Sequence, residues 1–417
     1  MCQNVDTIVL REVQISSFRY SIMEKDNLKP IQIILSDTFE DASDSDISTV
    51  LKESSSIDIR QRSFSSVQCD MSIRGGSFYQ NIVLINVINL SDVQTGHHNL
   101  NLPISTQNLA SIELISGPSS RLFGLNALTG AVNFISEIPQ ENSLNFDISF
   151  GSFKTTNVFF GINAITGKMK HSFNLNYGDS EGFTDNTDYN RKSLYYENNI
   201  DLKKIKLKAM LGLMDKEFGS NSFYTPMYAN QFEKIKTGFV AIKLSGAGLI
   251  NWDYNIYARQ LNDEFQLFRE GEGFYLQDQS YWINQNTRDT ITWYGGHNYH
   301  LTNVYGSGLS SWKDWGKWKA SLGADYRFEQ IYSNVLGVNI NHEIDGLYLK
   351  SDQRQNISFT AQTGYYGHRI IASVGGMAYW NQKYNWNFYS GGDIGYKFSE
   401  SLLLRAGINK AMRLPTF

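Results

Sequence analysis

The sequence predicts a β-class membrane protein in which a small α/β domain precedes a long antiparallel array of membrane-spanning strands. The segment from Met71 to Ser136 combines short apolar runs with repeated glycines, as a compact domain does. From Ser143 onward, apolar and polar residues alternate with period two, which is typical of strands that meet lipid on one face and an aqueous lumen on the other. Aromatic residues make up 14% of the chain, a surplus that aromatic girdles at both membrane interfaces would use.

Composition excludes several other classes of protein. No apolar run approaches the ~20 residues that a spanning helix needs, and the mean hydropathy is -0.34. The net charge of -4 gives no sign of a nucleic-acid partner. Cys2 and Cys69 are the only cysteines and form neither a disulfide framework nor a metal motif. Because nucleophile elbows, P-loops and zinc-protease helices are absent from the sequence, we predict that the protein is not an enzyme.

Residues 1–28 form a segment with too little apolar bulk for a core of its own. Its one apolar stretch, Thr7 to Leu10, stands among charged residues. An extended apolar segment of this kind can add as a strand to the sheet edge of a partner; the alternative is a frayed terminus. Met1-Cys2 leaves no room for the signal peptide of an exported protein, so we expect a leader upstream of this start.

Residues 29–138 predict the small α/β domain. Ser45 or Asp46 could cap a short helix that runs through Leu51. The expected strands are the apolar runs Ile31 to Leu35, Ile57 to Ile59, Ile82 to Ile88, Ile112 to Ile115 and Ala131 to Ile135.

Residues 139–417 predict about fourteen strands at the usual segment length. Connections alternate between tight turns, as at Thr166-Gly167-Lys168, and long polar loops, as from Asp179 to Lys192 and from Asn262 to Asn298. This alternation is typical of the periplasmic turns and extracellular loops of outer-membrane barrels. An open sheet of this size would leave unpaired edges in hydrocarbon, so we expect an N-terminal fragment of a larger barrel.

Several motifs of the small domain resemble those of the TonB-dependent outer-membrane receptors, in the same order and spacing. They are Ile73-Arg74-Gly75-Gly76, Val83-Leu84-Ile85-Asn86, Gly117-Pro118, Phe123-Gly124 and Gly130 to Ile135. Within that superfamily the chain is similar to cobalamin-receptor-like proteins of Bacteroidetes type. This second resemblance rests on Gln94 to Asn99, Phe218 to Tyr224, Ile331 to Asn334 and Met412 to Phe417.

The resemblance implies a plug domain, a barrel that closes at about 22 strands and a location in the Gram-negative outer membrane. It implies import of a scarce large nutrient, with a corrinoid as the first expectation and an iron-siderophore complex or oligosaccharide as the alternative. A surface glycan-binding β module is the alternative from another class. The implied partners are TonB, outer-membrane lipids and lipopolysaccharide, and a surface lipoprotein. The implied TonB box consists of Asp6, Thr7, Ile8, Val9 and Leu10.

The chain departs from the family pattern at three places. Asn86-Val87 stands where the family has Asp-Gly, Ser116 where it has Arg, and Thr129 where it has a second Gly. Replacing Gly matters where the backbone needs positive φ, because a side chain disfavours that conformation.

Two polar loops, 61–69 and 91–99, are expected at the outward apex of the plug as a ligand surface. His97-His98 lacks a spaced third ligand, so a hydrogen-bonding surface is favoured over a metal site. The candidate ligand-binding residues are Arg62, Ser63, Phe64, Gln68, Asp92, Gln94, Thr95, His97, His98 and Asn99.

Two further sets of residues complete the predictions. Arg74 and Arg121 are expected to be buried and paired with barrel carboxylates. The full set of structural plug residues is Arg74, Gly75, Gly76, Gly117, Pro118, Arg121, Gly124 and Gly130. Calcium is the one candidate cofactor, because oxygen donors gather in one predicted outer loop at Asp179, Asp185 and Asp188; no EF-hand spacing is present, and the alternative is a solvated loop.

Overall fold

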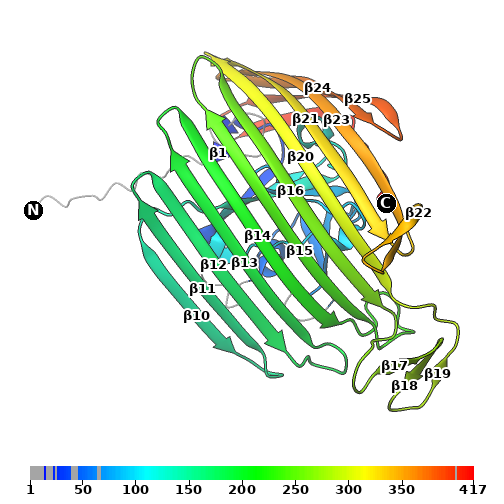
Figure 1. The fold of residues 1–417 in the computed structure, drawn as a ribbon. Helices are drawn as coiled ribbons and strands as arrows, with labels where there is room; N and C mark the ends of the chain where they lie inside the picture. Colours follow the sequence, from blue (N-terminus) through cyan, green and yellow to red (C-terminus); the bar gives the residue numbers. More distant parts are fainter. Residues whose placement is uncertain (1–13, 16–21, 24–25, 39–45, 63–66, 400–401) are drawn as a thin grey trace, which may run out of the picture.

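A computed structural model describes residues 14–15, 22–23, 26–38, 46–62, 67–399 and 402–417. A long curved sheet forms a wall, and a small mixed domain, the plug, lies against the inner face of that wall (Figure 1). The proposed division into 1–28, 29–138 and 139–417 stays a prediction. The plug ends in a strand at Ser136, and the first wall strand begins at Ser143.

The wall is an antiparallel sheet of 14 strands, as the sequence predicts. All except β22 follow one another in chain order, and β22 pairs only with β23, so it is an arm on a loop. Among the described residues, β10 pairs only with β11 and β26 only with β25. The strands are β10 (Ser143–Phe150), β11 (Thr156–Thr166), β12 (Met169–Ser180), β13 (Tyr189–Asp201), β14 (Ile205–Gly219), β15 (Phe232–Gly246), β16 (Asn251–Gln266), β20 (Asn298–Trp315), β21 (Trp318–Ser333), β22 (Val338–Ile344), β23 (Tyr348–Tyr366), β24 (Ile370–Asn381), β25 (Asn385–Lys397) and β26 (Leu403–Asn409).

The two ends of the wall differ in the length of their connections. One end carries tight turns, such as 202–204 between β13 and β14, and we call it the short-turn end. The other carries long loops, including 181–188, 220–231 and 267–297, and we call it the long-loop end. The last of these loops contains a three-stranded sheet that projects beyond the wall (Figure 1). Its strands are β17 (Tyr275–Asp278), β18 (Tyr281–Asn284) and β19 (Thr290–Ile291).

Side chains alternate across the wall as the period-two pattern predicts. On β14, Met210 and Met214 are buried against the plug, whereas Leu211 and Leu213 are exposed on the outer face. Cross-strand partners continue this apolar outer surface, as Leu211 does with Val240. A sheet with an outward apolar band and an inward polar or packed face suits a bilayer. No helix of the described residues is long and apolar enough to cross a membrane.

The plug is built on a five-stranded sheet in the order β3-β8-β9-β6-β7, in which β6 and β9 run parallel. A separate hairpin of β4 and β5 packs beside it, and a two-stranded sheet of β1 and β2 precedes it. The strands are β1 (Gln14–Ile15), β2 (Ile22–Met23), β3 (Ile31–Leu35), β4 (Ile57–Gln61), β5 (Cys69–Ile73), β6 (Asn81–Ile85), β7 (Ile88–Asn89), β8 (Leu109–Ser116) and β9 (Gly130–Ser136). The α-helices are α1 (Ile47–Lys52) and α2 (Ser120–Phe123), and the 3-10 helices are η2 (Ser36–Thr38), η4 (Gly96–His98) and η5 (Thr106–Asn108).

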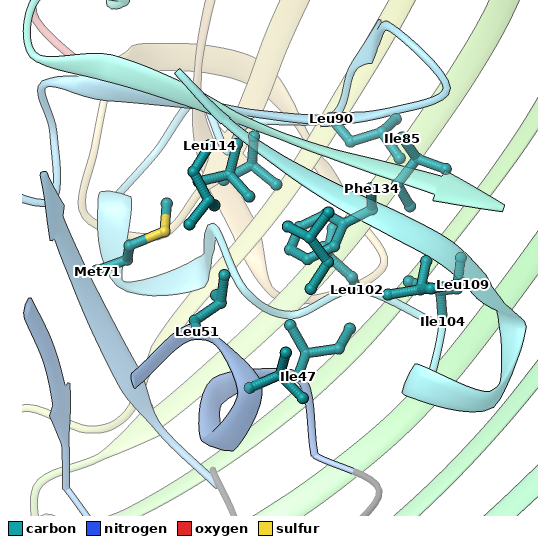
Figure 2. Packing of buried hydrophobic residues seen from close by; sticks show 14 of the residues in the cluster. Ile47, Leu51, Met71, Ile85, Leu90, Leu102, Ile104, Leu109, Leu114 and Phe134 are labelled. Carbon is teal, nitrogen blue, oxygen red and sulfur yellow. The ribbon is translucent and has the colours of Figure 1, made fainter. Parts of the chain in front are cut away.

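The plug core extends onto the wall. Asp46 caps α1 by accepting from the backbone N–H of Ser48 at 3.1 Å, which fixes the helix start. Figure 2 shows the side chains of the core, among them Leu51 and Phe134, packed together. The same cluster includes Tyr195, Met210 and Phe239 of the wall. Burial of this shared apolar surface docks the plug onto the sheet.

Two of the three departures from the family pattern replace a glycine. The two positions differ in their backbone conformation. Val87 has φ of 73° in the hairpin between β6 and β7, a conformation that a β-branched residue disfavours. Thr129 has no positive φ. Gly130, the next residue, needs to be glycine, because a Cβ there would lie 2.2 Å from the carbonyl oxygen of Ile115. The plug residues Gly75, Gly117 and Gly124 also have positive φ.

Candidate functional site

One link between plug and wall is a buried ion pair. Nη1 of Arg259 on β16 lies 2.9 Å from Oδ2 of Asp92, and both side chains are at most 3% exposed. Oδ1 of Asp92 also accepts from the backbone N–H groups of Gln94 and Thr95, at 2.8 and 3.0 Å. Burial raises the pKa of Asp92, but Arg259 and His98 outweigh it, so the pKa lies below its usual value. Asp92 is therefore a charged anchor of the plug.

A second anchor joins the same loop to β16. Nε2 of His98 lies 3.4 Å from Oδ2 of Asp263, and Nε2 of Gln94 donates to the same oxygen at 3.2 Å. Burial lowers the pKa of His98, but the Asp263 and Asp92 carboxylates raise it by more, so the pKa lies above its usual value. The two carboxylates therefore favour a protonated His98.

Arg121 makes a third anchor, at the far side of the plug. Its guanidinium is buried, contacts Asp393 on β25, and donates from Nε to Oδ1 of Asn409 at 2.6 Å. Lys29 reaches the same Asp393 carboxylate at 3.4 Å.

Arg74 differs from the expectation of burial: its side chain is exposed, and no ion pair joins it to a carboxylate of the described residues. It stands with φ of 48° in a turn directly after β5.

A fourth anchor uses backbone oxygens of the plug. Nη1 of Arg327 on β21 donates to the carbonyl of Asn89 at 2.8 Å, and Nη2 donates to that of Ser91 at 3.1 Å. Glu329 balances the charge, with its Oε1 2.6 Å from Nε of Arg327. The sequence analysis missed Arg259 and Arg327. Each arginine stands at an inward position of a wall strand, where a buried charge needs a partner. That position was the feature of the sequence that could have indicated a contact with the plug.

Around the loop 91–99, plug and long-loop side chains form what we call the apex cluster: Arg62, Asp70, Phe78, Tyr79, His97 and Tyr224. Nδ1 of His97 lies 2.5 Å from Oδ1 of Asp70, and Nη2 of Arg62 lies 3.1 Å from its Oδ2. Burial raises the pKa of Asp70, but His97 and Arg62 lower it by more. The side chains of His97 and Arg62 are 20% and 32% exposed.

Aromatic rings surround His97 in the apex cluster. The centroid of its ring lies 4.3 Å from that of Phe78 and 5.5 Å from that of Tyr224. The centroid of the Tyr79 ring lies 6.4 Å from that of His97, and Cζ of Arg413 lies 5.2 Å from the Tyr79 centroid. Tyr224 comes from the loop 220–231, so plug and long-loop end meet here. A half-open surface that combines a guanidinium, an imidazole and several aromatic rings can hold an anionic or planar group.

The predicted ligand residues divide into two groups. Gln68, Asp92, His98 and Asn99 are buried and hold the plug together, as Asn99 does by donating to the carbonyl of Phe78 at 3.1 Å. Gln68 and Asn99 satisfy backbone carbonyls, whereas Asp92 and His98 pair with side chains of the wall. A ligand-binding role for these four residues stays a prediction. Arg62, Gln94, Thr95 and His97 are partly exposed. Ser63, Phe64 and the proposed TonB box from Asp6 to Leu10 lie outside the described residues.

The predicted calcium ligands do not converge. No group of three His, Cys, Asp or Glu side chains in the described part of the chain could hold a metal ion. Asp179 accepts from Nδ2 of Asn190 at 2.9 Å, and both oxygens of Asp188 face the guanidinium of Arg269. In this structure Asp179, Asp185 and Asp188 therefore do not form one group of oxygen donors, and calcium binding by them stays a prediction.

A cavity of about 180 Å³ separates part of the plug from the wall. It runs beside the β6–β7 hairpin, and its wall side includes Asp253, Asn255 and Asp325. The plug is thus held by a few discrete contacts and an apolar patch, with a polar gap between them.

Comparison with known proteins agrees with this architecture. Residues 24–131 match the family described as TonB-dependent Receptor Plug Domain. No curated protein matches the sequence. Among solved structures, the chain is similar to the siderophore receptor PirA from Pseudomonas aeruginosa, with 11% identity and a TM-score of 0.68 over 92% of this chain and 62% of that one.

Two more solved structures have the same fold. A variant of the ferric enterobactin receptor PfeA from Pseudomonas aeruginosa is 15% identical, with a TM-score of 0.70 over 97% of this chain and 64% of that one. The ferric-catecholate import receptor Fiu from E. coli is 14% identical, with a TM-score of 0.63 over 94% of this chain and 64% of that one. The chain thus spans less than two thirds of the length of each of these three proteins.

These findings confirm the fold predicted from the sequence. Receptors with this plug are outer-membrane proteins of Gram-negative bacteria, which agrees with the outer-membrane location predicted from the sequence and with the apolar outer face of the wall. Residues 24–131 thus match the model of the TonB-dependent receptor plug domain, and the whole chain has the fold of the plug and barrel in these solved receptors.

Proposed function

We propose that this protein imports a scarce large nutrient across the outer membrane, driven by TonB. The observation that supports this most is the plug, a small domain docked on the inner face of the wall by a few buried charged contacts. A passive pore cannot concentrate a scarce solute. A plug that a pulling force shifts to a state of lower ligand affinity can release its ligand inward.

The ligand that we propose is a ferric siderophore. Arg62 offers positive charge, and the rings of Phe78, Tyr79 and Tyr224 offer stacking surfaces, a combination that suits an anionic chelate with aromatic groups. The printed descriptions of the three similar structures name siderophore, ferric enterobactin and ferric-catecholate receptors. A corrinoid is the second candidate, because the motifs Gln94 to Asn99 and Met412 to Phe417 resemble those of cobalamin-receptor-like proteins.

For energy coupling we propose the segment Asp6 to Leu10, which precedes the plug and could add as a strand to TonB. Strand addition uses backbone N–H groups, so Ile8→Pro should abolish uptake and leave ligand binding at the cell surface intact. Ile8→Val keeps the N–H group and is the matched control, with normal uptake expected. Normal uptake in the Ile8→Pro and Val9→Pro variants would place the coupling segment elsewhere.

The decisive experiment is ligand-dependent growth of a deletion strain that carries the full-length gene. The arms are ferric siderophores, corrinoids and oligosaccharides, each as the limiting nutrient. Rescue by a ferric catecholate alone supports the proposal, and rescue by a corrinoid alone shows that the second candidate is right. His97→Ala and Tyr79→Ala should reduce surface binding of the rescuing ligand, whereas Lys154→Ala, on an exposed loop at the same end, should leave it unchanged.

A further inference from the structure

Three long loops converge on one asparagine. Asn186 lies in the loop 181–188, is 6% exposed and has φ of 55°. Its Nδ2 donates to the carbonyls of Ala229 and Gln231 in the loop 220–231, at 2.9 and 2.6 Å. Its own carbonyl accepts from the backbone N–H of Asn221 at 3.1 Å. The first two loops are therefore joined by hydrogen bonds that a buried side chain and its backbone supply.

Arg269, from the third loop 267–297, closes this assembly. Its Nη1 donates to Oδ1 of Asn186 at 2.9 Å, and its two terminal nitrogens bind the two oxygens of Asp188 at 2.5 and 2.9 Å. Its backbone N–H donates to the carbonyl of Asn230 at 2.7 Å. One residue of the third loop thus contacts both of the others.

Aromatic rings complete the surroundings of the Arg269 guanidinium. Its Cζ lies 4.6 Å from the ring centroid of Phe232 and 4.4 Å from that of Phe274. The side chain is 18% exposed. A planar cation held by a bidentate carboxylate and by ring faces has a fixed geometry, which an ammonium group in its place would not have.

The same oxygens are those that a calcium ion in this loop would need. Calcium takes carboxylate, amide and backbone carbonyl oxygens, and the loop 181–188 offers such oxygens at Asp188 and Asn186. Both carboxylate oxygens of Asp188 and the amide oxygen of Asn186 already accept from Arg269. A guanidinium at this position and a divalent cation exclude each other by charge as well as by space.

We propose that Arg269 is a built-in cation that fastens the loops 181–188, 220–231 and 267–297 into one rigid collar without calcium. The collar touches the plug, because the carbonyl of Phe223 accepts from Arg62 and the ring of Tyr224 lies beside His97. Arg269 is thus a positioning residue for this surface. Its part in ligand capture rests on the proposed import function, whereas the fastening does not.

The test measures hydrogen exchange of the purified full-length protein in detergent, without any ligand. Arg269→Met should raise exchange about tenfold or more in 181–188 and 220–231, two loops that do not contain the substitution. Arg269→Lys should give an intermediate increase, because it keeps the charge and loses the fork. Arg288→Met, at an exposed arginine of the same third loop, is the matched control and should change neither loop.

Two further readings make the outcome decisive. Unchanged exchange of the β14 to β16 amides in each variant shows that the wall is folded, so a change in the loops is local. Adding calcium or a chelator to the unsubstituted protein should leave exchange of all three loops unchanged. Two results would overturn the proposal. One is calcium-dependent protection of 181–188, and the other is an Arg269→Met variant whose loops exchange as in the unsubstituted protein. Because no ligand is used, either result is independent of whether the transported nutrient is a siderophore.

Discussion

Arg259 on wall strand β16 donates from Nη1 to Oδ2 of Asp92 in the plug over 2.9 Å, with both side chains almost completely buried. The two residues are 167 positions apart in the chain. Removing one partner of a buried pair leaves a charge that neither water nor a neighbour satisfies, so the cost exceeds the strength of the pair itself. The plug is therefore most sensitive to substitution at its few charged contacts with the wall.

Asp92→Ala should lower the stability of the docked plug by about 3–5 kcal/mol, because Arg259 is left buried without a partner. Denaturant-dependent hydrogen exchange of the plug amides measures this. The matched control is Asp215→Ala, which breaks a pair with Lys236 at 3.4 Å whose side chains are 48% and 57% exposed. Such a pair contributes less than about 1 kcal/mol. Equal small effects from both substitutions would show that the plug is not held by this contact.

The stability of the docked plug should depend on pH through His98. Burial lowers the pKa of His98, but Asp263 and Asp92 raise it by more, so the pKa in the folded protein lies above the ordinary 6.5. A raised pKa gives stability that is fully present below pH 6.5 and is lost as the pH rises through the folded value. Plug stability should therefore fall as the pH rises above 6.5, and His98→Gln should remove this fall. His368→Gln, at an exposed turn, is the control, and a fall that persists in His98→Gln would assign it to another group.

Val87→Gly should stabilise the plug. A left-handed conformation costs an L-residue about 1–2 kcal/mol, and glycine removes this cost. Glycine also destabilises the folded state by about 0.5–1 kcal/mol, because its unfolded chain has more conformational entropy. The expected net gain is about 1 kcal/mol or less, measured from denaturant unfolding of the plug. Thr129→Gly should give no gain, because Thr129 does not have positive φ. A loss of stability in Val87→Gly would mean that its side-chain contacts outweigh the backbone strain.

Leu211→Arg should hinder folding of the full-length protein into lipid vesicles. Leu211 and its cross-strand partner Val240 lie on the exposed outer face, in the apolar band. An arginine near the bilayer midplane costs about 2–4 kcal/mol, against about 0–1 near the interface. Ile205→Arg, on the same face of β14 but at the short-turn end, should therefore have little effect. Similar folding midpoints for the two variants would contradict the membrane position of this band.

The sequence by itself determined the wall and the presence of the plug. Alternation on β14, with Leu211 outward and Met210 inward, follows from the period of a strand between two different environments, which acts residue by residue. The glycines of the plug were recognised through the resemblance of their motifs, and the structure gives Gly117 and Gly124 the positive φ that glycine adopts without strain. Signals of this kind can be read without knowing the partner.

Only the tertiary structure decided which polar residues anchor the plug and which remain open to a ligand. Asp92 and His98 sit in the same loop as Thr95 and His97, yet the first two are buried against Arg259 and Asp263 and the second two are partly exposed. The pairing depends on which inward positions of β16 face the plug. A register shift of one residue would turn every such side chain outward. The oxygens of Asp188 were expected to bind calcium, but they accept hydrogen bonds from Arg269. That contact could not be predicted from the sequence, because it forms where three loops distant in sequence meet.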